Sequence, residues 1–284
     1  MTKSIMGVDD GTQGTHWLSD GTSVRMPLLT ERASAVVGHF LIDAAKAEEL
    51  MPETDVRPVL VTPEHALITV QVMEYLEKNM DPYREFVCGI PVHRSPGENV
   101  PVASVTEADQ LPGNGSYIVH IAVDSAQALR VGRDVLGFPK IMADVQFSDS
   151  ATERIAEVSQ DGTPIFTLAV ERPDGPHETL RRDFHCYSVS PVDNAMYHVP
   201  YQLEVTATTL PGPGHARLVL GSHPVADELR ELGISAQSVG AIFVPQYALV
   251  SNLPDKVVPL PEWTEWRSAY RTDLDPVGTG SAGS

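Results

Sequence analysis

The chain has 284 residues, 42% of them hydrophobic, which is enough to bury the core of one large domain or two small ones. Its formal net charge of −18 argues against nucleic acid and anionic membranes as partners, because an acidic surface repels both. Cys88 and Cys186 make no disulfide framework, so a reducing, cytoplasmic setting is expected. No apolar run is long enough to predict a membrane span or a secretory signal.

Strand signals dominate the chain. Eight segments are rich in β-branched and aromatic residues, and clusters of turn residues separate them. In chain order these segments span residues 33–42, 66–75, 117–123, 163–170, 180–189, 201–208, 215–221 and 239–250. So many strands predict a mainly β domain whose sheet curls into a barrel-like or sandwich core.

Three short helices are predicted among the strands. Asp43 is a candidate N-cap for a helix over residues 44–51, and Asp124 is a candidate N-cap for a helix over residues 125–136. A third helix is expected over residues 225–232. Few helices beside many strands place the chain in a mainly β form of the α+β class.

No linker divides the chain into two domains. Residues 1–25 are polar and rich in glycine, and we expect them to form an N-terminal arm. Residues 26–275 are then a single domain, and residues 276–284 form a flexible tail.

Lys140 differs from the other lysines in its surroundings. It lies in the apolar segment 136–143, LGFPKIMA, whereas the other lysines have polar neighbours. A free lysine has a pKa of about 10.4 and is a weak nucleophile at neutral pH, but burial or a nearby cation lowers that pKa. The alternative is a lysine that only extends its amine from an apolar patch to water, and context alone favours this alternative.

The segment 132–140, GRDVLGFPK, resembles the signature of the acetoacetate decarboxylase family, and weaker similarity runs from about Arg32 to about Val250. The resemblance implies a curved antiparallel β-barrel or cone with a few short covering helices. It also implies that Lys140 is a Schiff-base nucleophile with Phe138 beside the substrate. By the same resemblance the protein is a homo-oligomer that acts on a small keto acid without a metal or an organic cofactor.

One position departs from the family pattern. The true decarboxylases have a second lysine directly after the first, where this chain has Ile141. Without that cation, we expect Lys140 to be activated mainly by burial. The departure favours relatives in which the same lysine serves an aldolase-dehydratase or a retro-aldolase with pyruvate-type substrates.

Two further candidate residues are Glu85 and Gln71. Glu85 falls where the resemblance places an active-site glutamate, and a carboxylate there could act as acid or base beside an iminium. The alternative is a surface glutamate paired with Arg84. Gln71 stands where the decarboxylases have an acidic residue, so the site would have lost one negative charge together with one positive charge.

Arg32 and Tyr247 are candidates for substrate binding. Arg32 falls near a family arginine that faces the substrate, and a guanidinium can hold a carboxylate by two hydrogen bonds. Arg25 is a rival, and a solvated arginine in a charged turn is the alternative. Tyr247 could donate a proton or fill the core, and we favour the core.

The sequence therefore predicts a Schiff-base carbon–carbon lyase that resembles acetoacetate decarboxylase. Aldol chemistry with pyruvate-type substrates is the second interpretation, and a small-molecule-binding protein with an inert lysine is the third. The spacing of the histidines matches no metal site. Because the acidic chain repels an anionic substrate, local cations would have to overcome that repulsion at the site.

Overall fold

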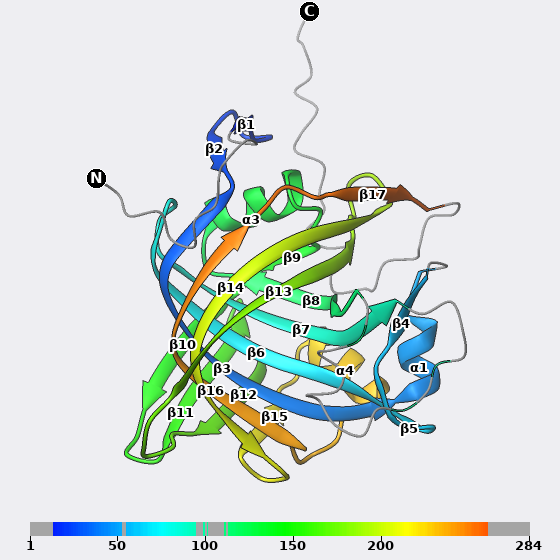
Figure 1. Cartoon of the computed structure of the whole chain (residues 1–284), viewed down its shortest axis with the longest axis vertical. Helices are drawn as coiled ribbons and strands as arrows, with labels where there is room; N and C mark the ends of the chain where they lie inside the picture. Colours follow the sequence, from blue (N-terminus) through cyan, green and yellow to red (C-terminus); the bar gives the residue numbers. More distant parts are fainter. Residues whose placement is uncertain are drawn as a thin grey trace, which may run out of the picture.

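The computed structural model describes residues 14–52, 55–94, 99, 101, 111 and 113–260, except for the side chains of residues 77 and 78. The strands are β1 Gly14–Trp17, β2 Ser23–Met26, β3 Leu28–Asp43, β4 Val56–Pro58, β5 Leu60–Thr62, β6 His65–Lys78, β7 Tyr83–Arg94, β8 Gly115–Val123, β9 Lys140–Met142, β10 Asp144–Asp149, β11 Glu153–Gln160, β12 Thr163–Glu171, β13 Glu178–Val189, β14 Ala195–Pro211, β15 Ala216–Leu220, β16 Gly240–Ser251 and β17 Lys256–Pro259. The helices of the described part are α1 Ala44–Glu49, α3 Ala126–Asp134 and α4 Pro224–Glu231 (Figure 1).

Seven strands close into a barrel, which confirms the predicted fold class. They pair in the order β7, β6, β3, β16, β14, β13 and β8, and β8 pairs with β7 to complete the ring. The pairing of β13 with β8 is parallel and joins only residues 185–187 to residues 115–117. This short pairing leaves residues 178–184 of β13 beyond the end of β8, at one end of the barrel wall.

The barrel wall has a core on each side, because successive side chains of a strand point to opposite faces. On β7, Phe86 faces outward and meets Phe166 of the sheet β10–β11–β12–β15 edge-on, with 5.1 Å between ring centroids. On β6, Val72 packs in this outer core, whereas Met73 and Tyr75 pack in a second core with residues of α3. We refer to this second core, which receives side chains from all seven barrel strands, as the interior core.

Helix caps tie α1 and α3 to the barrel. Asp43 caps α1 as predicted, since its side chain accepts a hydrogen bond from Lys46 N at 3.1 Å. The prediction that Asp124 caps α3 is wrong, because Ser125 is the N-cap. Asp124 instead accepts a hydrogen bond from Arg84 N at 2.7 Å. It thereby links the start of α3 to β7 directly beside Glu85.

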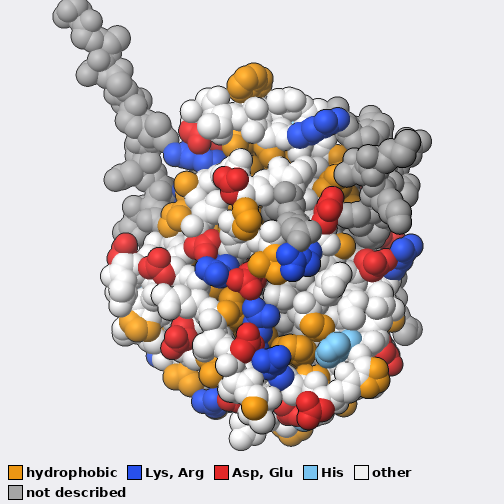
Figure 2. Space-filling view, turned by 90° about the vertical axis from the view of Figure 1, so that its left-hand side faces the viewer, with side chains coloured by type: hydrophobic (Ala, Val, Ile, Leu, Met, Phe, Trp, Pro, Cys, Tyr) orange, Lys and Arg blue, Asp and Glu red, His pale blue; other side chains and the backbone are white. Residues whose placement is uncertain are grey.

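Ion pairs join the barrel wall to the second sheet. Glu74 lies 3.0 Å from Arg84 of the neighbouring strand and 3.0 Å from Arg154 of β11. Figure 2 shows that acidic and basic side chains lie side by side over one face of the molecule, without a large patch of one charge. Because Glu74 and Arg84 are opposed in the β6–β7 ladder, their contact supports the register that brings Tyr75 near Glu85 on the other face.

The predicted N-terminal arm contains a hairpin. Strands β1 and β2 pair with each other near the end of the barrel where α3 lies (Figure 1). The first 13 residues and the predicted tail over 276–284 lie outside the described residues, so the domain division stays a prediction. No helix of the described part is both long and apolar enough to cross a lipid bilayer.

His39 generates a prediction for the pH dependence of stability. It is buried on β3, with Nδ1 3.0 Å from Thr69 Oγ1, and burial lowers its pKa from 6.5 to about 4. The unfolded chain takes up this proton below about pH 6.5, whereas the folded protein takes it up only near pH 4, so stability falls between these values as the pH drops. We expect His39→Gln to reduce that loss by up to about 3 kcal/mol.

Urea unfolding of the two proteins at pH 7 and at pH 4.5 measures this effect. The free energy of unfolding of wild type should fall further between these pH values than that of the His39 variant. Equal losses in both proteins would contradict the assignment.

Candidate active site

Lys140 and Glu85 form an ion pair inside the barrel. Lys140 Nζ donates a hydrogen bond to Glu85 Oε2 at 2.5 Å, and the two residues expose only 4% and 5% of their surface. Lys140 begins β9 and Glu85 lies on β7, and β8 runs between these strands. Neither the interpretation of a lysine that reaches water nor that of a surface Glu85–Arg84 pair fits this geometry, since Arg84 pairs with Glu74.

The signature segment shapes the space for the lysine. A Cβ atom on Gly132 would lie 2.4 Å from Cδ and 2.6 Å from Cε of Lys140, so only glycine leaves room for that side chain against α3. Arg133 Nε donates to the Lys140 carbonyl oxygen at 2.7 Å, and Phe138 N donates to the Gly132 carbonyl oxygen at 2.9 Å. The Gly-Arg pair therefore positions the lysine through both its stem and its backbone.

Gly137 turns the chain from α3 into β9. Its φ of +67° lies in the left-handed region that favours glycine, and a Cβ atom there would lie 2.3 Å from the Tyr197 ring. Its carbonyl oxygen accepts a hydrogen bond from Ser188 Oγ at 2.9 Å. This turn fixes where β9 begins and thus where Lys140 enters the interior core.

Four buried tyrosines pack in the interior core that holds the carboxylate. Tyr75 donates a hydrogen bond to Glu85 Oε1 at 3.2 Å, stacks on Tyr83 at 4.6 Å and meets Tyr247 edge-on at 6.0 Å. Burial raises the pKa of Tyr75, Tyr83, Tyr247 and Tyr201 above the usual range, and the charge of Glu85 adds to each shift. These phenols therefore stay neutral and can act as hydrogen-bond donors at physiological pH.

The amine lies among aromatic rings. Lys140 Nζ is 5.6 Å from the ring centroid of Tyr83 and 6.0 Å from that of Phe138. Burial raises the pKa of the Cys186 thiol. The charge of Glu85 raises this pKa further, whereas the charge of Lys140 lowers it. In the described part of the chain, no group of three or more His, Cys, Asp and Glu side chains could hold a metal ion.

The predicted substrate-binding residues fall in different places. Phe138 and Tyr247 are buried in the interior core near the pair. Gln71 lies on the same face of β6 as Tyr75, although among the described residues no hydrogen bond joins it to Lys140 or Glu85. Arg32 is exposed at an irregularity in the pairing of β3 with β6, outside the row of interior residues on β3.

Sequence reasoning missed Tyr75, Tyr83 and Cys186. Tyr83 and Glu85 are two residues apart on β7, so the alternation of side chains along a strand would have placed them on one face. Tyr75 ends a predicted strand, and the same alternation would have placed it on the face of Gln71. Their meeting depends on the pairing of β6 with β7, and β7 was not predicted as a strand.

Ile141 faces away from Lys140. Its side chain is fully buried in the outer core, whereas Lys140 enters the interior core, because adjacent residues of β9 point to opposite faces. A second lysine at this position would not lie beside the Lys140 amine. The inference that Ile141 removes a cation from the site therefore does not hold in this structure.

The model of the family described as acetoacetate decarboxylase matches residues 17–253. The chain belongs to the acetoacetate decarboxylase family. This confirms the resemblance drawn from the segment that ends at Lys140. A comparison with curated protein sequences gave no match.

Several solved structures share the fold. Acetoacetate decarboxylase from Legionella pneumophila is 16% identical, with a TM-score of 0.58 over 82% of this chain and 87% of that one. An acetoacetate decarboxylase-like enzyme from Sphingomonas wittichii RW1 is 13% identical, with a TM-score of 0.53 over 85% and 97%. The enduracididine biosynthesis enzyme MppR is also 13% identical, with a TM-score of 0.51 over 80% and 88%. At these identities the likeness shows the fold.

The close approach of Gly132 to Lys140 yields a prediction. Gly132→Ala is expected to lower the free energy of unfolding by about 1–3 kcal/mol, because the new methyl group overlaps the lysine stem. In a Lys140→Ala background the same change should cost nothing or stabilise α3 by up to about 1 kcal/mol. A double-mutant cycle of urea unfolding measures the difference. Equal costs in both backgrounds would exclude the clash.

Proposed function

We propose that this protein is a carbon–carbon lyase that forms a Schiff base between Lys140 and a small keto acid, as an acetoacetate decarboxylase-like enzyme. One observation carries the proposal, namely the buried amine of Lys140 at 2.5 Å from the Glu85 carboxylate. A lysine attacks a carbonyl group only after it loses a proton, and Glu85 is placed to accept that proton. Membership of the family supports the same chemistry.

The proposed reaction begins with transfer of one proton from Lys140 to Glu85. The neutral amine attacks the ketone carbon, the carbonyl oxygen leaves as water with the two amine protons, and the proton held by Glu85 returns to the nitrogen to give a protonated imine. When CO₂ departs from a β-keto acid, the electron pair of the broken bond moves into the imine and gives an enamine. Protonation of the enamine on carbon and addition of water then release the ketone product and restore the amine.

Aldol chemistry is the second candidate, and the tyrosines around Glu85 favour it. Loss of a proton from a pyruvate imine gives the same kind of enamine, which can add to an aldehyde. The later loss of a hydroxyl group as water requires a proton donor, and the hydroxyl of Tyr75 lies 3.2 Å from Glu85 Oε1. MppR has been solved with the condensation product of pyruvate and imidazole 4-carboxaldehyde.

Borohydride trapping tests the proposal. The protein is incubated with acetoacetate or with pyruvate, reduced, digested and analysed by mass spectrometry. We expect an adduct on the peptide that contains Lys140, and none on the exposed Lys46. An adduct with the mass of a reduced acetone imine would indicate that CO₂ was lost, whereas a pyruvate adduct alone would favour aldol chemistry.

Lys140→Met is the control for this experiment, and circular dichroism checks that the variant folds. It should form no adduct with either acid. If wild type also forms none while an authentic acetoacetate decarboxylase is labelled in parallel, the proposal fails for these substrates and a non-catalytic binding protein becomes the better interpretation.

A further inference from the structure

A keto acid brings a carboxylate toward a site that already holds one negative group, Glu85, and one positive group, Lys140. Lys140 and Glu85 together carry no net charge, and the chain as a whole carries −18. A cation near the entrance would offset the repulsion between this acidic chain and the substrate carboxylate. Arg32, the candidate from the family resemblance, is exposed outside the row of interior residues on β3. A cation with this role therefore has to lie on the interior face of another strand.

Arg182 lies on the interior face of β13. Phe184, two residues further along, packs against the interior core and stacks on Tyr201 with 5.2 Å between ring centroids. Cys186 follows on the same face, and Ser188, next in that row, donates a hydrogen bond to the Gly137 carbonyl oxygen at 2.9 Å, three residues before Lys140. Because alternate residues of a strand share a face, Arg182 belongs to the row that leads to the Lys140 amine.

Strand pairing places Arg182 on the same face independently. It lies opposite Leu203 of β14, and Leu203 lies opposite Leu249 of β16; both leucines pack in the interior core. In the adjacent row, Val205 lies opposite Tyr247, which contacts the tyrosine cluster around Glu85. Arg182 thus lies one row along and two strands across from Tyr247, on the same face of the barrel wall.

Exposure increases along this row of β13. Cys186 and Phe184 are half-buried, and Arg182 is exposed. Leu180, next in the row, exposes 45% of its surface although its partner Val205 packs in the interior core. The interior face of β13 therefore reaches solvent beyond the short pairing with β8, and Arg182 lies at this exposed end of the row.

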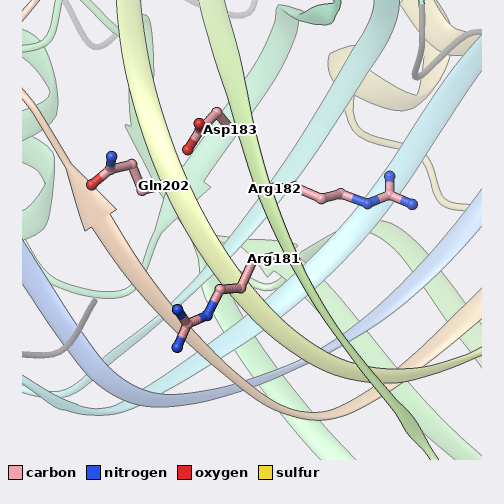
Figure 3. Close-up of a pocket in the computed structure, with 4 residues that line it drawn as sticks. All are labelled: Arg181, Arg182, Asp183 and Gln202. Atoms are coloured by element: carbon pink, nitrogen blue, oxygen red, sulfur yellow. The ribbon is translucent and has the colours of Figure 1, made fainter. Parts of the chain in front are cut away.

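Figure 3 shows the surface pocket lined by Arg181, Arg182, Asp183 and Gln202, and the two arginines point to opposite sides of β13. Arg181 points away from the interior and pairs with Glu204, with 2.7 Å between Nε and Oε2. The two neighbours therefore have the same charge and similar exposure, but only Arg182 shares a face with Phe184 and Cys186. This makes Arg181 a matched control.

We propose that Arg182 is a substrate-binding residue at the entrance of the barrel, where it attracts the carboxylate of the keto acid and directs the ketone toward Lys140. The proposal rests on the proposed Schiff-base function. A guanidinium can form two parallel hydrogen bonds with a carboxylate, and its charge does not depend on pH in the physiological range. Arg182 thus selects keto acids over neutral ketones of the same shape.

The test compares acetoacetate with acetoacetamide, its neutral analogue of similar size. The rate of adduct formation on Lys140 is measured for each compound in the presence of cyanoborohydride. We expect Arg182→Gln to lower the ratio of the acetoacetate rate to the acetoacetamide rate by about tenfold, while the acetoacetamide rate stays unchanged. Arg181→Gln should leave the ratio as in wild type, and Arg182→Lys should retain most of it.

The outcomes separate this proposal from the Schiff-base function on which it rests. If Lys140 is labelled but both glutamine variants give the wild-type ratio, or lower it equally, the role of Arg182 is overturned and the Schiff-base function stands. If neither compound labels Lys140 in wild type, both proposals fail together. Because Arg182 is exposed, its variants should have the thermal stability of wild type.

Discussion

A charged amine lies in an apolar interior only when a partner of opposite charge lies with it, and this constraint links the fold of the protein to its chemistry. Lys140 and Glu85 meet because β7 and β9 flank β8 and both side chains point inward. Gly132 leaves the room for the lysine stem, and Tyr75 occupies the second carboxylate oxygen. The barrel, the turn after α3 and the tyrosines thus all hold one hydrogen-bonded pair in place.

The same arrangement explains how a stable ion pair can also react. Within the low dielectric of the interior, the two charges attract strongly, yet transfer of a single proton converts them into a neutral amine and a neutral acid. The tyrosine hydroxyls stay protonated, so they can stabilise whichever form the carboxyl group takes. In this account Glu85 is both the structural partner that keeps Lys140 buried and the group that receives its proton.

Local sequence predicted the parts of this site that are local in the chain. The segment 132–140 points to Lys140 through its resemblance to the family, and Gly132 and Arg133 of the same segment contact that lysine in the structure. The tyrosines, the face of Ile141 and the orientation of Arg182 depend on which strands pair and in which register. The pairing of β6 with β7 joins residues as near in the chain as Tyr75 and Tyr83, but β7 itself was not predicted as a strand, so its contacts could not be predicted either.

A crystal structure of the protein reduced with borohydride in the presence of acetoacetate tests the central claim most directly. We expect continuous electron density from Lys140 Nζ to the former ketone carbon, inside the barrel, with the Glu85 carboxylate within hydrogen-bonding distance of the new secondary amine. Density for the acid on another lysine, or a free Lys140 amine that still contacts Glu85 beside bound but unmodified acid, would contradict it.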